Sequence, residues 1–309
     1  MPLLTVTLNA TVDKLYTVPG FTLDRVHRPA GMQVFAGGKG INVARVYTRL
    51  GGKVLATGFL GGQNGEYLRQ SLLAEGIASD FVTVAEESRV CTAVIDPITG
   101  TQTELNEIGP NVTLTECRAL LDRLRELLPG YDSVVLAGSA PPGTPPGIYR
   151  EIVALAQGEY GIPVTMDASG EMLKLGALAR PYLLKPNQHE LEALGVAGDG
   201  WGVSAQALRD QYGVTLGMVT AGRRGAVLAS AEGIWEAAPP PIDFKSAVGS
   251  GDSLTAAFLW GLAEKMSYPN ALALGVAAGA ANAATLGSGF ITHEEVTALA
   301  EQIVVKRLA

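Results

Sequence analysis

Short apolar segments alternate with longer helical patterns along this chain, and no other feature of the sequence restricts its fold as strongly. Strand patterns at 3–8 and 54–58 enclose a helical pattern over 41–50, and another helical pattern follows over 65–75. Further strand patterns lie at 133–137, 163–166, 182–185, 216–220 and 226–229. Parallel strands need long crossover connections, which are usually helices. We therefore expect an α/β fold in which a mostly parallel central sheet lies between two layers of helices.

The last third of the chain has a helical pattern, with helices expected over 252–265, 270–286 and 292–308. No internal repeat and no low-complexity linker divides the sequence. Residues 1–309 are therefore expected to form a single domain.

Two stretches, 17–35 and 89–106, break the alternation because they are rich in β-branched residues and carry few helix signals. The second predicts a β-hairpin with strands at 90–95 and 101–105. Such strands either extend the edge of the main sheet or form a small sheet of their own. Both stretches contain arginines suited to a ligand, so we expect a lid over the ligand pocket, formed by about 11–35 and 88–108.

Composition excludes several classes of function. The formal net charge is −7 and no block of lysine or arginine stands out, which argues against a nucleic-acid partner. Cys91 and Cys117 are too few for a disulfide framework, and the three histidines show no metal-ligand spacing. The start of the sequence lacks a signal-peptide pattern, and the most apolar segments, 254–263 and 271–281, are too short to span a membrane. We expect a cytoplasmic protein without a membrane partner.

The segment Ser-Ala-Val-Gly-Ser-Gly-Asp-Ser at 246–253 leads directly into a helical pattern. Gly249 and Gly251 permit a tight turn whose N–H groups point outward at a helix N-terminus, an arrangement that favours anions. Asp252 could simply cap the helix. Beside a phosphate-binding loop, however, it would deprotonate an acceptor hydroxyl while the N–H groups stabilise the transferred phosphoryl group. The segment therefore favours phosphoryl transfer.

Two common nucleotide-binding motifs are absent. Gly37-Gly38-Lys39-Gly40 is followed by Ile41, where a Walker A loop has serine or threonine. The first strand leads into Asn9-Ala10-Thr11 instead of the glycine-rich turn of a dinucleotide-binding fold. The glycine segment still opens a helix, so its backbone could approach a ligand closely.

Taken in order, the motifs resemble the PfkB/ribokinase superfamily of carbohydrate kinases, in particular the branch of the 1-phosphofructokinases and tagatose-6-phosphate kinases. The resemblance covers essentially the whole chain. Its motifs are Thr7-Leu8-Asn9 with Asp13, Gly37 to Ala44, Gly58 to Gly62, Ser88-Arg89, Thr103-Glu104, Gly109-Pro110, Gly138-Ser139, Lys185 to Leu191, Thr220 with Gly222 and Gly225, and Val248 to Ser253. It implies a ribokinase-like three-layer α/β/α fold with a small β-sheet lid, and an ATP-dependent kinase.

The resemblance also implies roles for individual residues. Asp252 would be the catalytic base, and Gly249, Ser250 and Gly251 would form the anion hole. The nucleotide side would consist of Lys185, Asn187, Thr220, Gly222, Gly225 and Asn282. Asn187 and Glu190 match the family's magnesium–phosphate positions, acting directly or through water. By pattern alone these two would be the N-cap region of a helix.

On the sugar side, the resemblance assigns hydroxyl-binding positions and a phosphate clamp. The hydroxyl-binding positions are Asp13, Gly37, Gly38 and Asn42, with Ser139 at the pocket edge. Arg28 and Arg89 would bind the phosphate already on the substrate, since a guanidinium can hold phosphate with two parallel hydrogen bonds. Lys39 would assist, and relatives that act on unphosphorylated sugars generally lack it.

The expected reaction moves the γ-phosphoryl group of ATP, with Mg²⁺, to the free hydroxymethyl group of a ketohexose monophosphate. The substrate is expected to be fructose 1-phosphate or tagatose 6-phosphate, because a furanose ketohexose has a hydroxymethyl carbon at each end. The alternatives are a kinase of an unphosphorylated sugar or of fructose 6-phosphate, and a non-catalytic sugar-phosphate sensor. The resemblance further implies a homodimer that packs through the lid.

Overall fold

A computed structural model describes residues 1–196 and 198–309. Within them, eleven strands form the main sheet in the spatial order β15-β14-β13-β12-β11-β10-β9-β1-β4-β5, with β6 also paired to β4. These strands are β1 (Leu3–Thr7), β4 (Val54–Gly61), β5 (Ala78–Ser79), β6 (Val82–Val84), β9 (Ser133–Gly138), β10 (Val164–Ala168), β11 (Leu183–Leu184), β12 (Leu216–Thr220), β13 (Ala226–Ser230), β14 (Gly233–Ala237) and β15 (Val305–Arg307). The pairs from β5 to β12 are parallel, and those from β12 to β15 are antiparallel. The expected mostly parallel sheet is confirmed.

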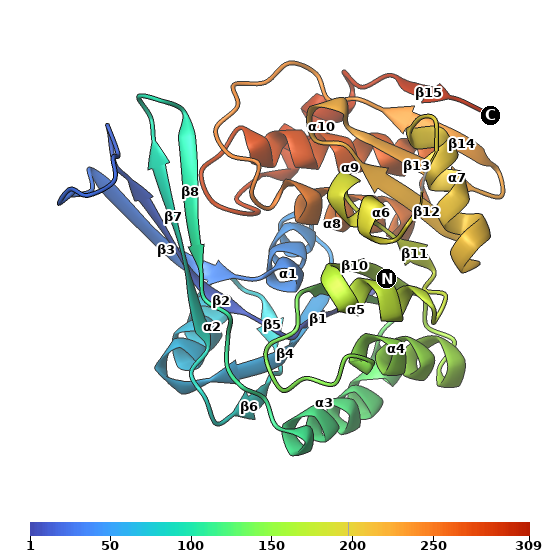
Figure 1. Cartoon of the computed structure of the whole chain (residues 1–309). Coiled ribbons are helices and arrows are strands. Elements are labelled where there is room, and N and C mark those ends of the chain that lie inside the picture. Colours follow the sequence, from blue (N-terminus) through green and yellow to red (C-terminus); the bar gives the residue numbers. More distant parts are fainter. Residues whose placement is uncertain (197) are drawn as a thin grey trace.

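Helices cover both faces of this sheet, which gives three layers (Figure 1). They are α1 (Lys39–Arg49), α2 (Gly62–Ala74), α3 (Leu114–Leu127), α4 (Ile148–Val153), α5 (Gly170–Ala177), α6 (Gln188–Ala193), α7 (Trp201–Tyr212), α8 (Ser250–Ala263), α9 (Tyr268–Ala283) and α10 (His293–Ala300). Alternate residues of a strand point to opposite faces, so Val134 and Leu136 of β9 pack with α3, α4 and α5. Val135 and Ala137 pack with α1, α8 and α9 on the other face.

The lid is a separate four-stranded sheet in the order β3-β2-β7-β8, and it projects from the three-layer body (Figure 1). Its strands are β2 (Thr11–Thr17), β3 (Gly31–Gly37), β7 (Arg89–Asp96) and β8 (Thr101–Asn106). The hairpin β7–β8 is confirmed, and β7 also pairs in parallel with β2. The Ser246 hydroxyl donates to Gln102 Oε1 at 3.1 Å. The lid therefore contacts the body just before the segment that leads into α8.

Glycines let α8 and α9 pack unusually close together. A Cβ atom at Gly275 would lie 3.0 Å from the carbonyl oxygen of Leu254, and one at Gly279 would lie 3.1 Å from that of Ser250. Such distances are shorter than ordinary van der Waals contact. The first turn of α8 is thereby fixed against α9.

The prediction of a helix over 292–308 is wrong beyond Ala300, where α10 ends. Residues Val305–Arg307 instead form β15, which pairs antiparallel with β14 at the edge of the main sheet. The β-branched run Ile303, Val304 and Val305 favours a strand once an unpaired sheet edge is available. Neither β14 nor α3 was expected from the sequence. Among the described residues, no helix has the length and apolarity that crossing a membrane would require.

Candidate active site

Most of the predicted site residues gather at the carboxyl ends of the parallel strands, the edge where open α/β sheets bind their ligands. Asp167 lies near the end of β10, Lys185 directly follows β11, and Thr220 ends β12. The first turns of α1 and α8 meet at the same edge, because Asn42 of α1 contacts Asp252 of α8. The structure thus brings together segments that are far apart in the sequence.

Asp252 lies in the first turn of α8 and is 5% exposed. Its Oδ2 accepts a 2.8 Å hydrogen bond from Nδ2 of Asn42. Burial raises the pKa of Asp252 to about 6, and the charge of Asp167 adds to the increase. The hydrogen bond from Asn42 and the nearby lysines act in the opposite direction. A carboxyl group with a pKa near 6 is ionised at neutral pH and still basic enough to accept a proton from a hydroxyl.

An anion site lies beside this carboxylate. Gly249 has a left-handed φ of 80°, and a Cβ atom there would lie 2.6 Å from the Ser288 Cβ, so only glycine fits. Within the described part of the chain, the backbone N–H groups of Gly251 and Asp252 have no hydrogen-bond acceptor. Free N–H groups at a helix N-terminus attract anions.

Asn282 supports the loop that leads into α8. Its Nδ2 donates to the Val248 carbonyl at 2.7 Å and to the Ser250 hydroxyl at 3.2 Å, while its Oδ1 accepts from the Gly289 N–H at 2.7 Å. The side chain is fully buried, and its amide is occupied by these contacts. The geometry therefore favours a supporting role for Asn282 over the predicted contact with the nucleotide.

Two lysines flank Asp167, a residue that sequence reasoning missed. Its Oδ1 lies 2.9 Å from Nζ of Lys39, and its Oδ2 lies 2.8 Å from Nζ of Lys185. Burial alone would raise the pKa of Asp167, but the two ammonium groups outweigh it and hold the pKa well below its usual range. A Cβ atom at Gly251 would lie 3.5 Å from Nζ of Lys185, so this ammonium group stands next to the anion site. A charged residue at the end of a predicted buried strand was the signal available for Asp167.

The sugar-side residues lie where the lid meets α1. Gly37 packs against Asp13, since a Cβ atom at position 37 would lie 2.0 Å from the Asp13 Oδ2. Burial raises the pKa of Asp13 to about 7, although Thr11 and Arg89 partly oppose the increase. Gly38 is the N-cap of α1, with a φ of 110° that other residues rarely adopt.

Ser139 and Arg89 both approach Asn9, at the same edge of the sheet. The Asn9 Nδ2 lies 3.4 Å from the Ser139 hydroxyl oxygen, and the Asn9 carbonyl accepts from Nη2 of Arg89 at 3.1 Å. Nη1 of Arg89 donates to the Glu107 carbonyl at 3.1 Å, whereas its buried Nε–H has no partner among the described residues. A buried donor without a partner is costly, so this position suits an added anion.

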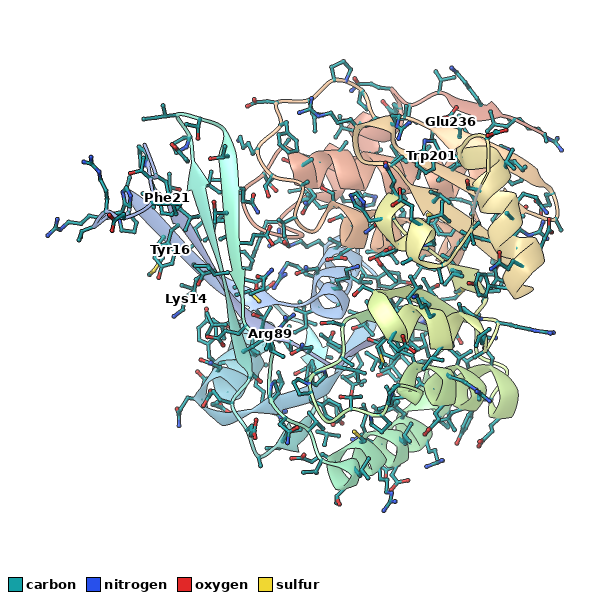
Figure 2. The ribbon with its side chains drawn as sticks, viewed as in Figure 1. Lys14, Tyr16, Phe21, Arg89, Trp201 and Glu236 are labelled. Carbon is teal, nitrogen blue, oxygen red and sulfur yellow. The ribbon has the colours of Figure 1, made fainter. Side chains whose placement is uncertain are left out.

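The structure does not bring Arg28 to the same place. Arg89 pairs with Thr11 at the base of the lid, whereas Arg28 is exposed in the loop beyond Thr17, about 20 Å further along β2 at ~3.3 Å per residue. Figure 2 shows Arg89 at the base and Phe21, of that same loop, at the far end of the lid. Within one chain the two arginines therefore lie at opposite ends of the lid. That both bind the substrate phosphate stays a prediction.

On the nucleotide side, Asn187 and Glu190 form the capping box of α6. The Asn187 Oδ1 accepts from the N–H groups of His189 and Glu190, and Glu190 Oε2 accepts from the Asn187 N–H. Oε1 of Glu190 faces Lys39 Nζ at 3.8 Å. Asn187 also forms a parallel β-bridge with Thr220.

The turn after Thr220 carries the last two predicted residues of the nucleotide side. Gly222 and Gly225 bound a short 3₁₀ turn and both have left-handed φ values, 55° and 83°. A Cβ atom at Gly225 would lie 2.0 Å from the Ala237 carbonyl oxygen. The turn therefore depends on backbone conformations that residues other than glycine rarely adopt.

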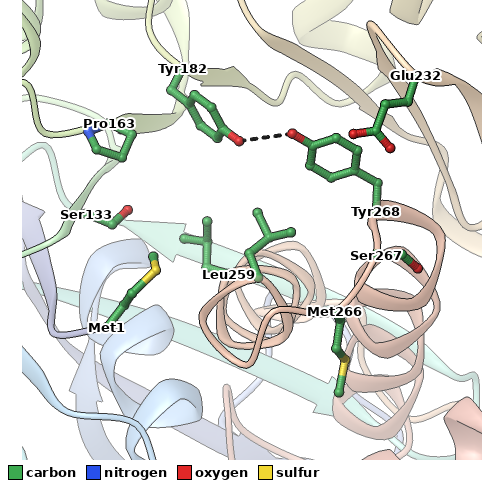
Figure 3. Close-up of a pocket in the computed structure, with 10 residues that line it drawn as sticks. Met1, Ser133, Pro163, Tyr182, Glu232, Leu259, Met266, Ser267 and Tyr268 are labelled. Atoms are coloured by element: carbon green, nitrogen blue, oxygen red, sulfur yellow. Dashed lines mark hydrogen bonds between the residues drawn. The ribbon is translucent and has the colours of Figure 1, made fainter.

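A cavity of the described structure lies away from this site. It has a volume of about 350 Å³ and is lined by Tyr182, Tyr268, Leu259 and Met1, among others (Figure 3). It lies at the amino ends of the strands, since Ser133 at the start of β9 lines it. No lysine or arginine is among its described lining residues, so it does not suit a phosphate group.

Comparison with known proteins decides the family. The pfkB family carbohydrate kinase pattern matches residues 4–295. The chain belongs to the PfkB family of carbohydrate kinases. It is similar to the 1-phosphofructokinase of Rhodobacter capsulatus, with 35% identity over 98% of this chain and 97% of the relative. It is 33% identical to that of Bacillus subtilis (strain 168), over 98% of this chain and 99% of the relative.

The fold of this PfkB kinase agrees with the same conclusion. Phosphofructokinase-2 from Escherichia coli, solved in complex with substrates and products, superposes with a TM-score of 0.88 at 29% identity, over 98% of this chain and 99% of that one. The ribokinase-like three-layer fold with its small separate sheet is confirmed. These relatives support an ATP-dependent sugar-phosphate kinase, and kinases of the family generally use a divalent metal. The roles of individual residues stay predictions.

Proposed function

We propose that this PfkB kinase transfers the γ-phosphoryl group of MgATP to O6 of fructose 1-phosphate, giving fructose 1,6-bisphosphate and ADP. The observation that carries the proposal is the position of Asp252, a buried carboxylate beside two free N–H groups at the start of α8. The names of the two curated relatives support fructose 1-phosphate as the first substrate to test. Tagatose 6-phosphate also has one free hydroxymethyl group, at C1 instead of C6.

Each part of the site has a distinct task in this reaction. Asp252 accepts the proton of the substrate hydroxyl as the oxygen attacks the γ-phosphorus. The N–H groups of Gly251 and Asp252 stabilise the negative charge on the transferred group. Lys185, 3.5 Å from the place of a Gly251 Cβ atom, adds a positive charge there. Lys39, at the start of α1, lies between the nucleotide side and the sugar side.

The oxygen ligands on the nucleotide side fit a magnesium ion that is held mainly by phosphates and water. Oε1 of Glu190 accepts no hydrogen bond from the described residues, whereas both carboxylate oxygens of Asp167 are already paired with lysines. Glu190 is therefore the carboxylate that would contact the ion. Mg²⁺ commonly binds through one or two carboxylates plus substrate phosphates. When bound, the ion neutralises charge on the ATP phosphates. The Asn187 Oδ1 already accepts two N–H bonds, so its role is to position Glu190.

The lid supplies the phosphate clamp and a surface for a second copy. Arg89, with its unpartnered Nε–H, is the arginine that we expect to hold the substrate phosphate. Exposed apolar residues on the lid include Leu23, Val26 and Met32. We propose that they are buried in a homodimer through the lid, which light scattering of the purified protein would test. A monomer in solution would contradict this arrangement.

A substrate panel tests the function directly. ADP release with MgATP is expected to be fast with fructose 1-phosphate and slow with fructose 6-phosphate and the free sugars. Faster turnover with tagatose 6-phosphate would make that sugar phosphate the preferred substrate and leave the proposed site unchanged. Turnover on free sugars alone would contradict the phosphate-binding role of Arg89. No turnover on any sugar would favour a non-catalytic sugar-phosphate sensor.

The same assay tests the clamp through Arg89→Met. Hydrogen bonds to charged groups contribute about 1.5–3 kcal/mol, so KM for the sugar phosphate should rise by about 10- to 100-fold. The Arg69→Met variant makes the same change of charge at an arginine bonded to Phe81 and Thr83, away from the lid. We expect it to leave KM unchanged. An equal effect of both variants would show that Arg89 acts only through net charge.

The rate is also expected to depend on pH. Asp252 must be ionised to accept a proton, so kcat/KM should fall about tenfold per pH unit below its raised pKa of about 6. The sugar phosphate itself ionises near pH 6. The Asn42→Ala variant separates the two, because loss of its hydrogen bond raises the pKa of Asp252 and leaves the substrate unchanged. If kcat/KM falls at the same pH in the wild-type chain and in Asn42→Ala, the decrease reflects ionisation of the substrate phosphate.

A further inference from the structure

Arg45 of α1 is 1% exposed, and each of its five N–H donors has a hydrogen-bond partner. Nε donates to Glu75 Oε2, and Nη2 donates to Glu75 Oε1 at 2.9 Å and to the Ala36 carbonyl at 2.6 Å. Nη1 donates to the Asn42 Oδ1 at 3.1 Å and to the Ser288 carbonyl at 3.0 Å. One buried guanidinium group thus joins the lid strand β3, helix α1 and the loop after α9.

The contact with Asn42 decides how that side chain is oriented. A guanidinium group has donors and no acceptor, so the atom of the Asn42 amide that faces Arg45 must be the oxygen. The NH₂ group of the amide then faces Asp252, to which it donates at 2.8 Å. If the amide rotated by 180°, its oxygen would face the carboxylate. Arg45 therefore selects the one orientation of Asn42 that favours an ionised Asp252.

The second contact of the same nitrogen reaches the anion site. Ser288 packs behind Gly249, the N-cap of α8, as the 2.6 Å clash of a Cβ atom at position 249 indicates. The carbonyl of Ser288 is the group that Arg45 holds at 3.0 Å. Arg45 consequently fixes both neighbours of the base: the amide that bonds its carboxylate and the loop that backs its helix N-terminus.

We propose that Arg45 is a positioning residue of the phosphoryl-transfer site, which acts on Asp252 through the amide of Asn42 and through the loop at Ser288. This inference rests on the proposed role of Asp252 as the base. A purely structural role explains the network less well, because a buried ion pair is often no more stabilising than apolar residues of the same volume. Glu75 balances the charge of Arg45, at the C-terminal end of α2.

The consequence for Asp252 follows from the groups around it. Asp13 of β2 and Asp167 of β10 repel its charge, whereas Lys39 of α1 and Lys185 after β11 attract it. Replacing Arg45 removes none of these four groups, although it also removes a positive charge that lowers the pKa of Asp13. The lost hydrogen bond from Asn42 should dominate, because Asn42 contacts the Asp252 carboxylate directly. Because this hydrogen bond favours the ionised carboxylate, its loss should raise the pKa of Asp252 by about one unit or more.

The experiment compares Arg45→Met with the wild-type chain in two assays. In steady-state kinetics, kcat should fall by about 10- to 100-fold, the loss typical of a misplaced reacting group, and the acid limb should move to higher pH. In carbon-13 NMR of protein labelled at the aspartate carboxyl carbon, with the Asp252 signal assigned from Asp252→Asn, the titration of Asp252 should move in the same direction. An unchanged titration would overturn the inference.

Arg49→Met is the matched control. Arg49 lies one turn further along α1, and its guanidinium carbon is 5.1 Å from the centre of the Phe290 ring, over which Arg45 also lies at 4.8 Å. Its Nη1 donates to the Ile291 carbonyl, away from Asn42. We expect normal kcat and a normal titration of Asp252. An effect as large as that of Arg45→Met would show that both arginines act only by supporting α1.

A second variant keeps the test valid if Arg45→Met fails to fold. Arg45→Lys retains the charge beside Glu75 but has only three donors on a compact ammonium group, so it should shift the titration of Asp252 less than Arg45→Met does. In an Asn42→Ala background, Arg45→Lys should cause no further shift, and a full additive shift would overturn the route through Asn42. The NMR readout needs no turnover. Wild-type protein inactive on every sugar would therefore defeat the proposed function and leave the positioning role to be judged by the titration alone.

Discussion

Replacing Asp252 with asparagine is expected to lower kcat by at least ~10²–10⁴-fold, the usual contribution of general acid–base catalysis. The amide has the same shape as the carboxylate but cannot accept the proton of the substrate hydroxyl. The free N–H groups at the start of α8 are unchanged, so binding of MgATP and of the sugar phosphate should be retained. Turnover is measured by ADP release, and binding by calorimetry.

Asp243→Asn provides the control for this substitution. It makes the same change of charge at an exposed position in the segment that precedes α8. We expect kcat to stay within a factor of about two, since surface substitutions away from special contacts usually have small effects. Near-normal turnover of Asp252→Asn would contradict the role of Asp252 as base. Loss of binding together with turnover would assign it to the substrate pocket instead.

The second large effect is expected on stability. Asp167→Asn leaves the Lys185 ammonium group buried without its carboxylate and removes the partner of Lys39. Breaking a buried ion pair by removing one partner typically costs about 3–5 kcal/mol. The free energy of unfolding, measured with urea, should therefore fall by about that amount. Phosphate ions should restore part of the loss, because they supply the negative charge that the two lysines lack.

The matched control is Asp122→Asn, which breaks the exposed ion pair between Asp122 and Arg125 on α3. Solvent screens such surface pairs, so the free energy of unfolding should hardly change. An equally small effect of Asp167→Asn would show that water or local rearrangement satisfies Lys185, and that the Asp167 carboxylate does not hold the two lysines in place.

Sequence patterns predicted the parallel sheet and the lid because these features depend on local periodicity and turn chemistry. The strand at 216–220 coincides with β12, and the hairpin at 90–105 lies within β7 and β8. The pattern failed at 301–308, where pairing with β14 decides the structure. A strand at a sheet edge depends on a partner that is distant in sequence, so periodicity within the segment cannot reveal it.

The candidate site was predicted only in part, because some of its residues belong to local motifs and others depend on contacts that are distant in sequence. Asp252 and the glycines before it form a local motif and were found. Asp167 and Arg45 were missed because each matters through contacts with residues more than 25 positions away, such as Lys39 and Glu75 respectively. The sequence also did not reveal the length of the lid strands that separate Arg28 from Arg89.

The pairing of β1 between β4 and β9 has a consequence for how the chain matures on the ribosome. Residue Leu3 aligns with Val54 on one side and with Ser133 on the other, so the second edge of β1 stays open until β9 has been synthesised. Long-range pairings of this kind fold slowly and expose strand edges meanwhile. Asp13 is synthesised well before Asp252. A nascent chain therefore contains all four strands of the lid before it contains Asp252, the proposed base, and phosphoryl transfer must wait until α8 has been synthesised.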